Sequence, residues 1–185
     1  NFDTSNVTDF SSMFRTGPSF ASSALDLRHF NTSSATTFAN MFQYQFTPNS
    51  GFITSINVTG WDTSNVTKFN AMFADMENLT SIIGLNTFDT SSATAMNGMF
   101  FELPSLTSID VSNFDTSNVT YMNAMFYNLS SITSLDVSNF DTSSATAMNA
   151  MFYQLSYITS LDLSNFDTSS VTNMQSMFYR LGRLT

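Results

Sequence analysis

The sequence of 185 residues contains no cysteine, only five Lys and Arg, and a single histidine. Without cysteine there is no disulfide, no thiolate zinc site and no cysteine nucleophile. Fourteen Asp and Glu leave a net charge of −9. A nucleic-acid binder needs clustered basic residues to release counterions, and anionic lipids attract basic segments. We therefore expect no nucleic-acid partner. No apolar run approaches the roughly 20 residues that span a bilayer, so we also expect no direct membrane insertion.

Apolar residues are nevertheless abundant. Hydrophobic residues make up 42% of the chain and aromatic residues 15%, whereas charged residues make up only 10%. This composition is too apolar for a disordered chain, and the length is that of one ordinary domain. The chain opens within its own pattern at Asn1-Phe2-Asp3. We expect residues 1–185 to form a single repeat domain, as a piece of a longer surface protein.

The sequence is built from a repeated unit. Each unit begins with an aromatic residue that is followed by Asp or Asn and then Thr-Ser. The seven units begin at Phe2, Phe30, Trp61, Phe88, Phe114, Phe140 and Phe166. A Met-Phe pair follows each aromatic residue after a constant 11 positions, as in Met125-Phe126. Fixed-period self-similarity is typical of repeat architectures.

The first half of each unit predicts a helix. In the fifth unit, Val119, Met122 and Phe126 stand 5, 8 and 12 positions after Phe114, which is one face of a helix. The Asp-Thr-Ser before them offers side-chain acceptors for the free N–H groups at a helix start. The spacing therefore predicts a short helix of about two to three turns in each unit.

The second half of each unit predicts a strand. Ile109 and Val111 alternate with Asp110, and Leu135 and Val137 alternate with Asp136. One helix and one strand per unit cannot bury their own apolar sides, whereas stacked neighbours can. We therefore expect an α/β solenoid of about seven strand-plus-short-helix repeats, with a parallel β-sheet on one face and the Met and Phe columns inside. One extra residue near Ile82-Ile83-Gly84 predicts a bulge in the third strand.

Two stretches carry a resemblance to a known family. The segment Ile132-Thr-Ser-Leu135-Asp-Val137-Ser-Asn-Phe140 is similar to the strand segment of leucine-rich repeats. The stretch Phe114-Asp-Thr-Ser-Asn-Val-Thr-Tyr-Met-Asn-Ala-Met-Phe126 resembles the roughly 26-residue repeat of BspA-like bacterial surface proteins. This resemblance implies a leucine-rich-repeat-like fold, an extracellular location at the cell surface and a role in adhesion.

A column of acidic residues in the predicted strands marks a candidate binding face. It contains Asp26, Asn57, Asp110, Asp136 and Asp162, with Gly84 interrupting it. Like charges about 5 Å apart repel, so solvent, a cation such as Ca²⁺ or a ligand must offset them. No calcium-binding motif is present, which favours a solvated polar face over bound Ca²⁺. The candidate binding residues are Ser108, Asp110, Ser112, Ser134, Asp136, Ser138, Ser160, Asp162 and Ser164.

Other side chains allow two interpretations. The lone His29 has no fixed nucleophile beside it, so we read it as a surface residue and expect no enzyme activity. Five tyrosines lie in the later units, where they form an exposed ridge or pack at the edge of the core. These residues are Tyr121, Tyr127, Tyr153, Tyr157 and Tyr179.

These observations predict a non-catalytic extracellular module that binds a protein or glycan of a host or neighbouring cell. Many weak polar contacts, repeated along the polar strand face, would supply avidity. The alternative is a stalk or fibre subunit that assembles by end-to-end stacking.

Overall fold

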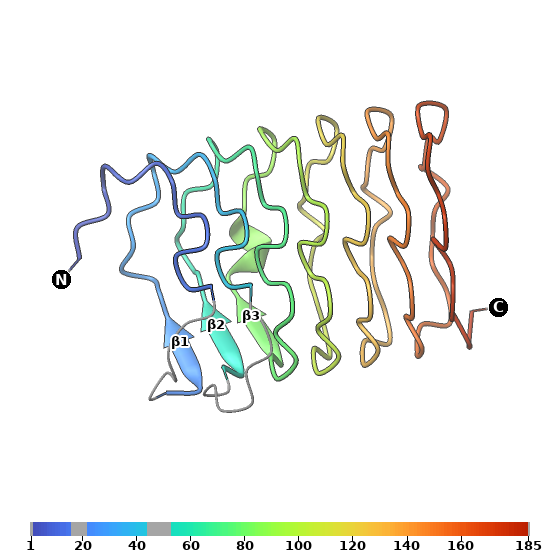
Figure 1. Ribbon diagram of the computed structural model, residues 1–185, viewed down its shortest axis with the longest axis horizontal. Helices are drawn as coiled ribbons and strands as arrows, with labels where there is room; N and C mark the ends of the chain where they lie inside the picture. Colours follow the sequence, from blue (N-terminus) through green and yellow to red (C-terminus); the bar gives the residue numbers. More distant parts are fainter. Residues whose placement is uncertain (1, 16–21, 44–52, 185) are drawn as a thin grey trace.

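The computed structural model describes residues 2–15, 22–43 and 53–184. Three short strands, β1 (Ala24–Asp26), β2 (Ser55–Asn57) and β3 (Ser81–Ile83), form a parallel sheet in the order β1-β2-β3 (Figure 1). A single 3-10 turn in the described residues, η1 (Leu85–Thr87), follows β3. We number the units 1 to 7 in the order of the seven aromatic starts. Each of the first three units contributes one strand.

A second line of parallel bridges joins all seven units. It runs through Asp9, Thr37, Lys68, Ala95, Tyr121, Ala147 and Asn173, each residue pairing with the next. Every bridging residue stands seven positions after the aromatic start of its unit. Figure 1 shows the units side by side from the N-terminus to the C-terminus. The chain is therefore a β-rich repeat protein in which each unit hydrogen-bonds to its neighbours in sequence.

The predicted helices are wrong, because no α-helix occurs in the described residues. Alternate backbone N–H groups donate to the next unit, and several of those between them, such as Met99 to the Met96 oxygen, donate three residues back. Gly98 donates to the Asn123 oxygen and Glu102 to the Tyr127 oxygen, both at 2.9 Å. Gly98 and Glu102 have φ angles of 61° and 55°, which a right-handed helix does not allow. The spacing of 5, 8 and 12 arises from tight turns, not from a helical period.

Left-handed residues recur at two positions of the unit. One set stands ten positions after the aromatic start, and the other stands fourteen positions after it in units 3 to 7. The first set is Ser12, Asn40, Ala71, Gly98, Ala124, Ala150 and Ser176, and the second is Asp75, Glu102, Asn128, Gln154 and Arg180. Each such residue lies in a turn of its unit, where a positive φ changes the direction of the backbone.

The strand prediction is confirmed in units 1 to 3 and wrong in units 4 to 6. No strand occurs at Ile109–Val111, Leu135–Val137 or Leu161–Leu163. Asparagine side chains bond to the start of their own unit there: Asn113 Nδ2 donates to the Phe88 oxygen at 2.8 Å, and Asn139 Nδ2 donates equivalently to Phe114. Units 1 to 3 carry His29, Gly60 and Thr87 at this position, so they lack the asparagine bond.

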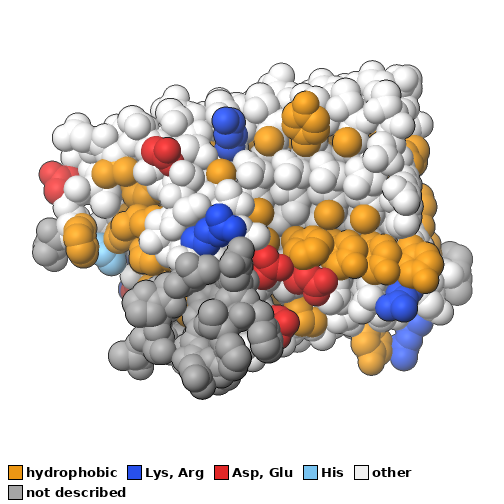
Figure 2. Space-filling view, viewed as in Figure 1, with side chains coloured by type: hydrophobic (Ala, Val, Ile, Leu, Met, Phe, Trp, Pro, Cys, Tyr) orange, Lys and Arg blue, Asp and Glu red, His pale blue; other side chains and the backbone are white. Residues whose placement is uncertain are grey.

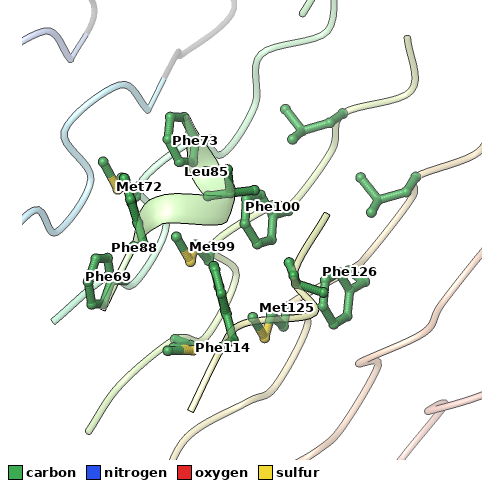
Figure 3. Packing of buried hydrophobic residues seen from close by; sticks show 14 of the residues in the cluster. Phe69, Met72, Phe73, Leu85, Phe88, Met99, Phe100, Phe114, Met125 and Phe126 are labelled. Carbon is green, nitrogen blue, oxygen red and sulfur yellow. The ribbon is translucent and has the colours of Figure 1, made fainter. Parts of the chain in front are cut away.

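The Met and Phe columns fill the interior, as predicted. The Met-Phe pairs of units 4, 5 and 6 are fully buried. The rings of Phe73, Phe100, Phe126 and Phe152 follow one another with centroids 5.9 Å apart and planes within 9° of parallel, and Figure 3 shows the first three. Each buried ring contributes about 1.5–3 kcal/mol through removal from water. Exposure returns at the two ends, where Met13 is 45% and Phe178 43% exposed.

Candidate functional site

The nine predicted binding residues lie in units 4, 5 and 6, one Ser-x-Asp-x-Ser segment in each unit. All of them are exposed except Ser138, which is half-buried. Figure 1 shows these units as neighbours in the green-to-orange part of the chain. The structure thus places the predicted residues on a surface of three adjacent units, although the segments that carry them are not strands.

Each aspartate of this surface folds onto the serine two residues later. Asp110 Oδ1 accepts hydrogen bonds from the Ser112 hydroxyl at 2.6 Å and from its N–H at 3.2 Å. Asp136 accepts the same pair from Ser138. Asp162 accepts the Ser164 N–H at 3.0 Å. A carboxylate keeps free lone pairs after two such bonds, so a ligand donor can still reach each aspartate.

These turns keep the aspartates ionised. Hydrogen bonds from the Ser112 hydroxyl and N–H lower the pKa of Asp110, while the charge of Asp136 opposes that shift. The pKa of Asp136 is lowered by Ser138 in the same way, against the charge of Asp162. The pKa of Asp162 is lowered first by the Ser164 N–H. The three carboxylates therefore form a row of like charges that repel one another along the units.

A pocket of about 220 Å³ opens at the first aspartate of this row. It lies between unit 3 and unit 4 and is lined by Ser81, Ile82, Leu85, Asn86, Ser108, Ile109 and Asp110. Ser81, Asn86, Ser108 and Asp110 offer polar groups, while the remaining three side chains are apolar. The repeat pattern did not reveal this pocket, because two of its lining residues, Leu85 and Asn86, come from the irregular stretch after β3.

Gly84 lies in the irregular stretch of unit 3 beside this pocket. The extra residue predicted as a bulge leads into Gly84, which has a φ of 92° and precedes η1. In β3, Ile83 pairs with Asn57. Ile83, and not Gly84 as the sequence predicts, therefore interrupts the acidic column. Ile83 is 49% exposed. The column is therefore interrupted by an apolar side chain next to the pocket.

The Asp or Asn that follows each aromatic start closes a turn instead of capping a helix, and we call these residues the second acidic column: Asp3, Asn31, Asp62, Asp89, Asp115, Asp141 and Asp167. Asp115 Oδ1 accepts the Ser117 N–H at 3.0 Å, and Asn31 Oδ1 accepts the Ser33 N–H at 3.1 Å. Asn31 shows that the acceptor oxygen matters here more than the charge. In units 1 to 6, each residue of this column is followed by a buried threonine, which the repeat pattern alone did not mark as functional.

Tyr127, Tyr153 and Tyr179 stack on one another together with Phe101. The ring centroids are 4.6, 4.4 and 5.0 Å apart along the series. We call these four residues the aromatic ridge. Tyr179 is 51% exposed, whereas Phe101, Tyr127 and Tyr153 are half-buried. Figure 2 shows a row of hydrophobic side chains across the C-terminal half of this face.

The other predicted tyrosines lie outside the ridge. Tyr121 belongs to the line of bridges, and Tyr157 stacks under the Arg183 guanidinium at 4.5 Å. His29 is exposed, with its ring edge-on to Phe30. Among the described residues no group of three His, Asp or Glu side chains is placed to hold a metal ion. In the same part of the chain, no helix has the length and hydrophobicity needed to span a bilayer.

Comparison with known proteins identifies one family. The family model described as "Mycoplasma protein of unknown function, DUF285" matches residues 1–56, 44–135 and 109–185. Together these three overlapping matches cover the whole chain. Searches of curated proteins and of solved structures found no match.

Proposed function

We propose that this chain, which belongs to the DUF285 family of Mycoplasma proteins, is a BspA-like, leucine-rich-repeat-like solenoid. In this proposal it acts as a non-catalytic adhesion module outside the cell. The repeat, the parallel bridges and the buried Met-Phe columns support the solenoid. Stacked repeats create extended surfaces suited to binding large partners.

The observation that carries this proposal is the pocket beside a repeated polar surface. Ser108 and Asp110 line the pocket, and the same Ser-x-Asp-x-Ser segment recurs in the next two units. A partner anchored in the pocket would meet the same donors and acceptors again at Asp136 and Asp162. Repetition raises the effective concentration of each further contact, so weak single bonds add up to useful affinity.

A protein or glycan of a host or neighbouring cell fits the chemistry of this surface. Exposed hydroxyls and carboxylates accept and donate hydrogen bonds, which suits sugar hydroxyls and peptide amides. Strongly anionic partners are disfavoured by the net charge of −9. Nothing in the proposal requires a metal ion or cofactor.

Binding to a glycan array and to a panel of extracellular proteins tests the proposal. For any partner found, replacing Asp110, Asp136 and Asp162 together with Ala should weaken binding at least about tenfold without lowering the melting temperature by more than a few degrees. The matched control replaces Asp115, Asp141 and Asp167, which close similar turns elsewhere in the units. Equal loss in both variants, or loss in neither, would remove the polar surface from the proposal.

A second candidate function is end-to-end assembly into a stalk or fibre. Between units 6 and 7, the N–H groups of Met148, Ala150, Phe152 and Gln154 donate across the interface. The corresponding N–H groups of Met174, Ser176, Phe178 and Arg180 have no partner among the described residues. Unpaired sheet edges of this kind accept another chain. Electron microscopy of the pure protein would show filaments if this function is correct.

A further inference from the structure

The aromatic ridge exposes ring edges instead of ring faces. Its four rings stack on one another, and the planes of Tyr127 and Tyr153 are only 8° from parallel. The faces inside the series are therefore covered by neighbouring rings, which leaves ring edges as the exposed part of the half-buried members. Nucleic-acid bases and sugars bind aromatic side chains through open ring faces, which this ridge lacks along most of its length. A protein surface with its own aromatic edges and hydroxyls is the better match.

A column of polar residues runs directly beside the ridge. Each ridge residue is followed in sequence by one member of this column, namely Glu102, Asn128, Gln154 and Arg180. The column is connected within the chain: Asn128 Nδ2 donates to Glu102 Oε2 at 2.5 Å, and Arg180 Nη1 donates to Gln154 Oε1 at 3.3 Å. It therefore carries a negative charge at one end, two amides in the middle and a positive charge at the other end.

The charges of this column are complementary to those of a second copy of the column that runs in the opposite direction. Figure 2 shows acidic side chains beside one end of the hydrophobic row and a basic side chain below the other end. If a second copy lies antiparallel on the ridge, its Arg180 faces Glu102 and its Gln154 faces Asn128. The aromatic series is then also matched, since Phe101 faces Tyr179 and Tyr127 faces Tyr153. A parallel copy would instead place like charges opposite each other.

We propose that the aromatic ridge and its polar column form a two-fold dimer interface, in which a second copy of this chain packs antiparallel and pairs Glu102 with Arg180 twice. A two-fold axis between units 5 and 6 generates both pairs from one patch, as an isologous interface requires. The dimer is closed, so it differs from the open-ended stacking described above. Because both charge pairs lie at the rim of the contact, added salt weakens the association.

Charge exchange tests the proposal on the full 185-residue chain. Arg already occupies this column at position 180 with a φ of 61°, so Glu102→Arg introduces a residue type that the column tolerates. In a dimer of E102R, both pairs become Arg–Arg, and in a dimer of R180E both become Glu–Glu. Each single variant should therefore raise the dimer dissociation constant at least about tenfold. The control Glu77→Arg makes the same charge change outside the column and should leave the constant unchanged.

Mixing the two variants separates a lost contact from a damaged fold. In a one-to-one mixture of E102R and R180E, both charge pairs of the mixed dimer again join one arginine to one glutamate, so sedimentation velocity should show the dimer restored. The double variant E102R/R180E should dimerise alone for the same reason. A wild-type chain that stays monomeric over the concentration series, one that forms open-ended polymers, or a mixture that stays monomeric would overturn the proposal.

Discussion

The Thr116 hydroxyl donates a hydrogen bond of 2.8 Å to the main-chain oxygen of Asp141 in the next unit. Thr116 is only 1% exposed. The same bond recurs along the chain, for example from Thr90 to Asp115 and from Thr142 to Asp167, both at 2.9 Å. A buried threonine thus joins each of units 1 to 6 to the next at the turn that precedes the bridge line.

Thr116→Val should destabilise the protein by about 0.5–1.5 kcal/mol, because it removes the hydrogen bond that this buried hydroxyl donates to the next unit. For a chain of this size, that corresponds to a fall of a few degrees in the melting temperature. The matched control is Thr94→Val, whose hydroxyl lies at the surface 3.2 Å from the Thr67 oxygen. Water can replace that exposed bond, so Thr94→Val should change stability by less than about 0.5 kcal/mol. Equal melting temperatures for the two variants would contradict the argument.

Gly84→Ala should be far more damaging than Gly60→Ala. Both glycines have positive φ, at 92° and 85°, so the backbone cost is similar. A Cβ on Gly84 would lie 2.5 Å from the Thr59 nitrogen, whereas a Cβ on Gly60 would have no atom within 4 Å. We expect a loss of about 1–2 kcal/mol for Gly60→Ala and of about 2–5 kcal/mol for Gly84→Ala, measured by urea unfolding. Similar losses would show that the backbone near Thr59 yields easily.

The left-handed residues that stand ten positions after the aromatic start include both Gly98 and Ala124, so glycine can be replaced by alanine at one and alanine by glycine at the other. Gly98→Ala should cost about 1 kcal/mol, since its φ is 61° while a Cβ there would meet only Phe101 Cβ at an ordinary 3.6 Å. Ala124→Gly, at a φ of 54°, should gain up to about 1 kcal/mol. Ala145→Gly is the control, because Ala145 is buried and is not left-handed, and it should lose stability. Unfolding curves in which Ala124→Gly loses as much as Ala145→Gly would show that φ does not decide the outcome.

Stability should fall in acid through the turn-forming aspartates. Hydrogen bonds from serine lower the pKa of Asp110, Asp136 and Asp141 in the folded state, and Arg28 lowers the pKa of Asp26 to about 2. A group whose pKa is lower when folded stabilises the fold above its unfolded pKa, near 4. That contribution is lost as the pH falls through the native pKa. Melting temperatures should therefore drop below about pH 4, and Asp136→Asn should drop less, because its acceptor oxygen does not titrate.

A repeat of this kind allows burial to be predicted but not the local conformation. The spacing of Val119, Met122 and Phe126 correctly indicated three inward side chains. A helix and a chain that turns at left-handed residues both place those side chains inside. Ala124 carries no sign of a left-handed backbone, and the asparagine and aspartate that favour it stand at only some equivalent places, namely Asn40, Asp75 and Asn128.

The candidate surface was predicted in part. The acidic column and its serines follow from the repeat, and the structure places them on adjacent units. The pocket beside Asp110 was not predictable, because Leu85 and Asn86 of its lining come from a stretch that departs from the repeat. The aromatic ridge was predicted as one of two interpretations for Tyr127, Tyr153 and Tyr179, whereas Phe101 was missed because a search for tyrosine does not find it.

The units, the apolar columns that fill the interior and the acceptor oxygens that close the turns all follow from the order of the amino acids. These features repeat at a fixed offset, and burial of a repeated apolar side chain follows from its aversion to water. Which backbone N–H groups bond within a unit, and which bond to the next one, depends on how the units pack together. Neighbouring units supply carbonyl oxygens at the right distance, and this competition between local and neighbouring partners leaves no mark in the sequence of one unit.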